Sequence, residues 1–118
     1  MATFTRQTLT EAGLTPTYNA ANAGGDQVDN SDGRTFLHVK NASGGSITIT
    51  IAEQISGTTV EDPALGTLTK TSVAKAVAAG AEAVIGPFKK AAFNDVNGFI
   101  QLTYSGVTTF TVAAFKFP

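Results

Sequence analysis

The sequence predicts an all-β protein: a single-domain antiparallel β-sandwich or jelly-roll-like fold with seven or eight short strands and little helix. Three observations support this prediction. Short segments alternate apolar and polar residues with a period of two, turn-forming residues separate them at near-regular intervals, and no segment is clearly helical. The length of 118 residues fits one domain, spanning residues 1–118, and no internal repeat or linker divides it.

The first fifteen residues, 1–15, are expected to form an N-terminal arm. Ala2 to Thr10 alternates as an edge strand does, while Thr8 to Glu11 also fits a capping box that would start one turn of helix. Both interpretations stay open up to Pro16, which ends any such turn. A short strand is predicted over Thr17 to Ala20.

A long polar loop is predicted over Asn22 to Gly33, and its carboxylates invite comparison with a calcium-binding loop. Aligning Asn30, Asp32 and Gly33 with an EF-hand loop places valines at its first and last ligand positions, and valine cannot bind calcium. The stretch around Asp95 fails in the same way. We therefore interpret Asp32–Gly33 and Asn97–Gly98 as turns.

The central prediction is a β-hairpin. Its strands are Arg34–Lys40 and Ser46–Ala52, and the five residues between them are rich in turn formers. An antiparallel register would put the aliphatic side chains of both strands on one face, pairing Val39 with Ile47 and Leu37 with Ile49.

Two further hairpins are predicted in the C-terminal half. Strands Ser72–Ala78 and Ala81–Ile85 flank a turn at Gly80, although the alanines of this segment also favour a helix. Strands Phe99–Ser105 and Val107–Phe115 flank Gly106. In these last two strands, alternation predicts two inward-facing sets: Ile100, Leu102 and Tyr104, and Phe110, Val112 and Ala114.

The segment between the first two hairpins, residues 56–70, is harder to interpret. Glu61–Asp62–Pro63 predicts a turn, and Thr67 to Thr71 predicts a strand. The neighbouring carboxylates of Glu61 and Asp62 do not predict acid–base chemistry, because sequence neighbours on a strand point to opposite faces.

Composition and single residues argue against several classes of function. A formal net charge of −1 with 14% charged residues argues against a nucleic-acid partner and against a charged membrane surface. The chain has no cysteine, and its one histidine, His38, lies in mid-strand, so neither a zinc site nor a catalytic triad is predicted. We therefore expect no enzyme, no catalytic residue, no metal site and no cofactor.

Low charge combined with 42% hydrophobic residues favours a protein that works in a permanent assembly. No run approaches the ~20 apolar residues of a membrane span, and the start of the chain lacks the regions of a signal peptide. The expected place of synthesis is the cytoplasm, with no membrane partner.

Several stretches together resemble a known family. They are Gly25 to Gly44 (GDQVDNSDGRTFLHVKNASG), Ala78 to Phe88 (AAGAEAVIGPF), and Phe93 to Gly98 (FNDVNG) running on to Leu102–Ser105 (LTYS). They resemble the small structural proteins that tailed bacteriophages encode beside the major capsid protein, described as head decoration, cement or minor capsid proteins. The resemblance covers most of Gly25–Ala114 and leaves out residues 56–70.

The resemblance implies a virion protein on the outside of the capsid, made in the host cytoplasm and stabilising the assembled shell. The implied partners are the major capsid protein and further copies of the chain, with a trimer favoured, and the family has no catalytic residues to transfer. Two alternatives stay open. One is a tail-tube, tail-terminator or head–tail connector subunit, and the other, of a different class, is a glycan-binding β-sandwich on the virion surface.

Apolar residues at both ends of the chain suggest where a partner is contacted. We expect Ala2–Arg6 to lie on a partner subunit, with Arg6 paired to a carboxylate there; the alternative is that Phe4 adds an edge strand to its own sheet and Phe115 fills its own core. The candidate interface residues are Thr3, Phe4, Arg6, Phe36, His38, Lys89, Lys90 and Phe117.

Overall fold

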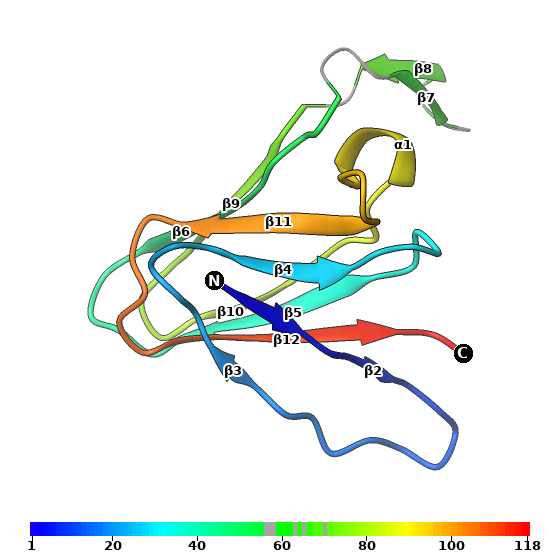
Figure 1. The fold of residues 1–118 in the computed structure, drawn as a ribbon. Coiled ribbons are helices and arrows are strands. Elements are labelled where there is room, and N and C mark those ends of the chain that lie inside the picture. The colour runs from blue at the N-terminus through cyan, green and yellow to red at the C-terminus, as the bar shows by residue number, and fades with distance from the viewer. Residues whose placement is uncertain (56–58, 63, 65, 70) are drawn as a thin grey trace.

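The computed structural model describes residues 1–55, 59–62, 64, 66–69 and 71–118 and confirms the predicted β-sandwich. Two sheets pack face to face (Figure 1). Sheet 1 has the strand order β1-β4-β11-β6-β9, and sheet 2 has the order β10-β5-β12-β2, with β3 also paired to β12. The elements are β1 Ala2–Phe4, β2 Arg6–Thr8, β3 Asn19–Ala20, β4 Asp26–Asp29, β5 Phe36–Asn41, β6 Ile47–Ile51, β7 Thr59–Asp62, β8 Gly66–Thr69, β9 Val73–Val77, β10 Glu82–Ile85, α1 Lys90–Phe93, β11 Phe99–Tyr104 and β12 Phe110–Lys116.

The six strands predicted from alternation are present as β5, β6, β9, β10, β11 and β12, most with ends shifted by a residue or two. The segment that also favoured a helix forms β9 and β10, and α1 is a single short turn. No helix among the described residues is long and apolar enough to span a bilayer.

The pairing predicted for the three hairpins is wrong. β5 lies in sheet 2 and β6 in sheet 1, and the same separation holds for β10 and β9 and for β12 and β11. Each short connection is therefore an arch that crosses from one sheet to the other. Leu37 and Ile49 do both point into the core, where each is fully buried, but they approach it from opposite sheets.

The predicted polar loop over Asn22 to Gly33 is also wrong in its middle, because β4 lies within sheet 1 between β1 and β11. Its Asp26 and Val28 side chains are fully buried. The Asp26 carboxylate accepts hydrogen bonds from the Ala2 amide (3.0 Å), the Asn22 amide (3.1 Å) and side chain (2.6 Å), and the Tyr104 hydroxyl (2.8 Å). Burial, together with the hydrogen bond and charge of Asp26, raises the pKa of Tyr104, which keeps its hydroxyl a donor.

The N-terminal arm joins the two sheets. β1 pairs with β4 at the edge of sheet 1, and after Thr5 the chain enters β2, which pairs with β12 at the edge of sheet 2. Both pairings are parallel, so the sheets are mixed and not purely antiparallel. Residues 9–18 contain no helix, and the turn after Thr10 closes with a hydrogen bond from the Gly13 amide to the Thr10 carbonyl.

The segment between β6 and β9 contains a separate two-stranded hairpin of β7 and β8 (Figure 1). The turn predicted at residues 61–63 is wrong in its first two residues, because Glu61 and Asp62 belong to β7. Pro63 lies outside the described residues, as does Lys70 of the strand predicted over residues 67–71. β8 forms the earlier part of that strand, ending at Thr69.

The core lies between the sheets and is filled by the inward residues of both. The two inward-facing sets predicted for β11 and β12 are confirmed: Tyr104 is partly buried, and the other five side chains are buried almost completely. Phe88, two residues before α1, and Phe93, the last residue of α1, add two rings in edge-to-face contact at 5.8 Å. The buried apolar residues of this core are Phe4, Ala21, Val28, Leu37, Val39, Ile47, Ile49, Ile51, Val77, Ile85, Phe88, Ala92, Phe93, Ile100, Leu102, Phe110, Val112 and Ala114.

Candidate interface on the outer face of sheet 2

The outer face of sheet 2 follows from the period of two. Because Leu37 and Val39 point inward, their neighbours Phe36 and His38 point outward. The register aligns Phe36 with Phe115 of β12 and His38 with Val84 of β10, so these four side chains share the outer face. Apolar side chains thus gather on this face and stay partly open to solvent.

Three phenyl rings form a column on this face. The ring of Phe36 stacks on Phe115 at 5.6 Å and meets Phe117 in a tilted contact at 5.3 Å, both measured between ring centroids. Phe115 is 6% exposed, whereas Phe117 is 60% exposed and Val84 is 68% exposed. The column therefore runs from a covered ring to one that solvent reaches.

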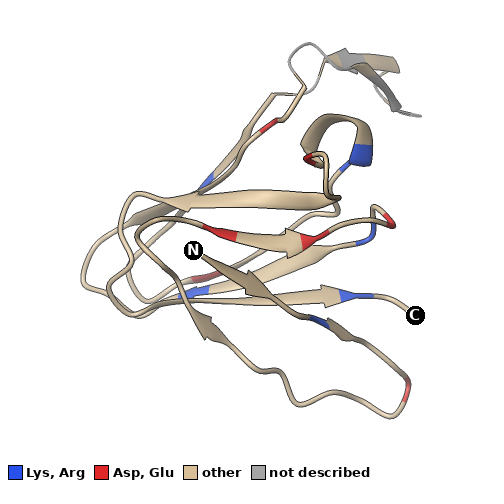
Figure 2. Ribbon diagram, viewed as in Figure 1, with Lys and Arg blue, Asp and Glu red and all other residues tan. Residues whose placement is uncertain are grey.

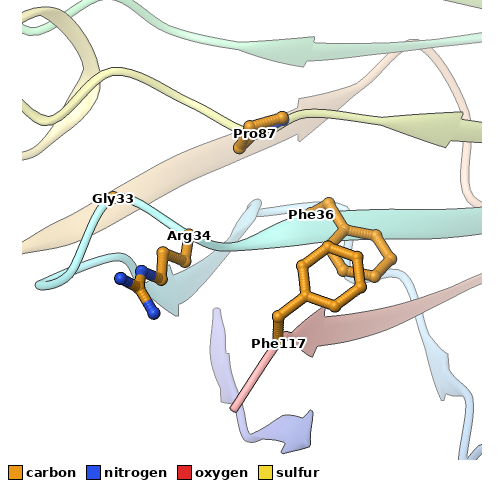
Figure 3. A pocket seen from close by; sticks show the side chains of 5 residues that line it. All are labelled: Gly33, Arg34, Phe36, Pro87 and Phe117. Atoms are coloured by element: carbon orange, nitrogen blue, oxygen red, sulfur yellow. The ribbon is translucent and has the colours of Figure 1, made fainter. Parts of the chain in front are cut away.

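Two apolar hollows flank the Phe36 ring. One, of about 260 Å³, is lined by Gly33, Arg34, Phe36, Pro87 and Phe117 (Figure 3). The other, of about 200 Å³, is lined by Leu9, Phe36, His38, Val84 and Phe115. We call this surface, made of Leu9, Phe36, Val84, Pro87, Phe115 and Phe117, the aromatic face.

A polar group borders the aromatic face. The Tyr18 hydroxyl and His38 Nδ1 are hydrogen-bonded at 2.6 Å, His38 Nε2 lies 2.9 Å from Glu82 Oε1, and Lys40 Nζ lies 4.0 Å from the centre of the Tyr18 ring. Both imidazole nitrogens thus have partners from the same chain.

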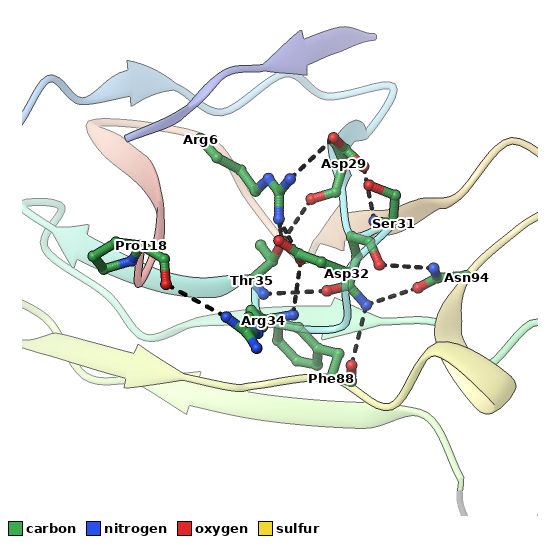
Figure 4. Close-up of polar contacts among 10 residues, drawn as sticks. Arg6, Asp29, Ser31, Asp32, Arg34, Thr35, Phe88, Asn94 and Pro118 are labelled. Atoms are coloured by element: carbon green, nitrogen blue, oxygen red, sulfur yellow. Dashed lines mark hydrogen bonds and ion pairs between the residues drawn. The ribbon is translucent and has the colours of Figure 1, made fainter. Parts of the chain in front are cut away.

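The prediction that Arg6 pairs with a partner's carboxylate is wrong, because its partners belong to the same chain (Figure 4). Arg6 Nη1 lies 2.6 Å from Asp32 Oδ1, and Nη2 lies 3.1 Å from Asp29 Oδ2. Nη1 also donates to the Thr35 hydroxyl at 3.2 Å. Phe4 is 4% exposed and belongs to the core, so the alternative of an edge strand on its own sheet is the one observed.

The electrostatics of the cluster of Arg6, Asp29 and Asp32 indicate that these side chains stabilise the fold. Burial favours the neutral acid at both Asp29 and Asp32, but it is outweighed by hydrogen bonds and by the Arg6 charge, so the pKa of each carboxyl is lowered. Next to it, the buried Asn30 side chain donates to the Phe88 carbonyl (3.1 Å) and to Asn94 Oδ1 (2.7 Å). Together these contacts tie β2 and the residues on both sides of α1 to the turn between β4 and β5.

The structure brings together only some of the candidate interface residues. Phe36, His38 and Phe117 meet on the outer face of sheet 2. Thr3, Phe4 and Arg6 lie in the N-terminal arm, where the Thr3 hydroxyl accepts a hydrogen bond from Gln27 at 2.8 Å. The two lysines at positions 89 and 90 lie at the start of α1, and both are exposed.

Sequence reasoning missed other members of the aromatic face. Leu9 directly follows β2, whereas Val84 and Pro87 belong to β10 and the residues just after it, and only the strand pairings show that they meet. The alternative in which Phe115 fills its own core is wrong, because Phe115 is buried yet points outward from sheet 2 and stacks on Phe36. The available signal was the spacing of Phe115 and Phe117, which puts both on one face of an extended chain.

Charged side chains are sparse across both sheets (Figure 2). Within the described part of the chain, no group of three or more His, Asp or Glu side chains is placed to hold a metal ion. Comparison with protein-family models, curated proteins and solved structures found no match.

Proposed function

We propose that the chain is a structural virion protein that decorates the outside of a tailed-phage head and stabilises the assembled shell. The observation that carries this proposal is the aromatic face, where Phe117 and Val84 stay exposed on a chain whose own core is already filled. A contiguous apolar surface of this kind is typical of an interaction site. The sequence resemblance supplies the partner class, the major capsid protein.

Decoration requires no chemistry beyond binding. A protein that binds the assembled shell, and not its dissociated subunits, shifts the equilibrium toward the shell by mass action. Because the shell repeats the same site many times, a homo-oligomer, with a trimer favoured, binds with modest affinity at each contact. Few charges and a predominantly apolar docking face suit such a long-lived contact.

Capsids assembled without this protein provide the test. We expect the purified protein to sediment with them until the sites are saturated, and to raise the temperature at which the capsids break open. Absence of binding would contradict the proposal. In virions, a copy number that matches the capsid lattice would support it, whereas the much lower number expected of a ring would favour a tail or connector subunit. Glycan-array binding without capsid binding would favour the glycan-binding alternative.

A further inference from the structure

We propose that the hollow beside Arg34 is an anchor site for one apolar side chain of the capsid protein, and that a carboxylate next to that side chain pairs with Arg34. This inference rests on the proposed function and adds the chemistry of the segment that is recognised. Three observations support it: the size of the hollow, the unused hydrogen-bond donors of the Arg34 guanidinium, and the charges around the hollow.

The hollow has the size and lining of a side-chain pocket. Its volume of about 260 Å³ falls below the ~300–1,000 Å³ of sites for small molecules. Figure 3 shows the rings of Phe36 and Phe117 beside one another, with Arg34 across from them and Pro87 at a third side. Two phenyl rings and a proline ring favour an aliphatic or aromatic side chain, which would be desolvated as interface anchors are.

The Arg34 guanidinium has donors to spare. Among the described contacts it donates one hydrogen bond, from Nη1 to the Pro118 carbonyl, and at 3.4 Å that bond is long. A guanidinium has five N–H donors in a plane, and it binds carboxylates through two of them at once. Asp32 is close in sequence, but Arg6 Nη1 lies 2.6 Å from its Oδ1 atom.

The charges near the hollow are mostly positive, and the one carboxylate next to Arg34, that of Asp32, accepts from the Arg34 amide at 3.0 Å and is paired with Arg6. The Lys90 side chain passes Gly33 closely, so that a Cβ at Gly33 would lie 3.0 Å from Lys90 Cγ. Lys89 and Lys90 are exposed, and neither forms an ion pair with a described residue. Arg34, which lines the hollow, and Lys90, which lies against Gly33, thus leave positive charge beside it that no carboxylate side chain pairs among the described residues, and this favours an acidic segment over a basic one.

The experiment measures the affinity of labelled protein for capsids assembled without it. Arg34→Glu and Phe117→Ser are the test variants. Lys75→Glu, the same charge change on the exposed edge strand β9, and Val96→Ser, at a side chain that is 100% exposed, are the matched controls. We expect each test variant to weaken binding about tenfold or more and each control to bind as the unmodified protein does. Arg34→Glu should also reduce the salt dependence of binding.

The outcomes separate this inference from the proposed function. If the unmodified protein does not bind capsids, the proposed function fails first. If it binds, and both test variants bind equally well, the anchor site is wrong while decoration stands. Thermal unfolding of each variant verifies that it is folded, which the exposure of Arg34 and Phe117 favours.

A cross-link identifies the occupant. With photoreactive benzoylphenylalanine in place of Phe117, irradiation of decorated capsids should join this position to an apolar residue of the capsid protein that has Asp or Glu adjacent or next but one. Attachment to a basic segment, or to a second copy of this chain, would overturn the inference.

Discussion

Phe4 offers the sharpest test of how the N-terminal arm is held. The side chain is 4% exposed and packs in the core at the end of β1, where the arm begins to cross from sheet 1 to sheet 2. Phe4→Ala removes a whole ring from this position. Substitutions of this type in a core cost about 3–5 kcal/mol of unfolding free energy, because the ring's contacts are lost and a cavity remains.

The expected loss of thermal stability follows from chain length. For a domain of this size each kcal/mol corresponds to roughly 3–6 °C in Tm, so Phe4→Ala should lower Tm by roughly 10–30 °C. Circular dichroism during heating measures Tm, and urea unfolding measures the free energy directly. The control is Val96→Ala, at a fully exposed side chain, which should change stability by less than about 0.5 kcal/mol. A Tm for Phe4→Ala within a few degrees of the unmodified protein would refute the docking of this arm in its own core.

Three further changes test other parts of the fold. Ile49→Ala should cost about 2–5 kcal/mol in urea unfolding because Ile49 is fully buried, whereas His38→Ala should cost less than about 1 kcal/mol because its ion-pair partner is exposed; equal losses would contradict the assignment of faces. Gly86→Ala should lower Tm, because Gly86 has φ +122° and a Cβ would lie 2.9 Å from the backbone of β5, while Gly44→Ala, with no such neighbour, should not. Acid should destabilise the protein as pH falls below about 4. Burial favours the neutral acid at three carboxyls, but hydrogen bonds to the carboxylates outweigh it and lower their folded pKa values below the ordinary 3.8. Their contribution is therefore present above that value and is lost as pH falls through the folded pKa values, and a Tm that does not change from neutral pH to about pH 2 would contradict this role for Asp29, Asp32 and Asp95.

The sequence predicts the strands well and their partners poorly, and there is one physical reason for both. Alternation reports which side chains face the core, and a hairpin and an arch satisfy it equally. Leu37 and Ile49 would be buried in either arrangement. A hairpin and an arch differ in which strands are hydrogen-bonded to each other. Here β5 pairs with β10 and β12, and β6 pairs with β9 and β11. These pairings depend on residues far away in the chain.

The missed strand β4 shows a second limit. Burying a carboxylate without hydrogen-bond donors is costly, so the sequence predicts that Asp26 is exposed and that its segment is a loop. The donors exist, but the Tyr104 hydroxyl is 78 residues away in the sequence. In the same way, the sequence shows that Arg6 is charged but does not identify its ion-pair partners, because Asp29 and Asp32 are 23 and 26 residues away.

The candidate interface, like the fold, could be predicted from the sequence only in part. Alternation predicts that Phe36 and His38 share a face, the apolar C-terminal end of the chain makes Phe117 a candidate, and the structure places all three on one face. Val84 and Pro87 join them only because β10 pairs with β5. The basic rim at Arg34 and Lys90 likewise requires the approach of α1 to the turn before β5.

The most direct test of the proposed docking is a cryo-electron microscopy reconstruction of capsids saturated with this protein. The account predicts that sheet 2 faces the shell, with capsid-protein density over Phe36 and Phe117 and beside Arg34. Bound protein whose aromatic face is turned to solvent, with sheet 1 or the β7–β8 hairpin against the shell, would contradict it.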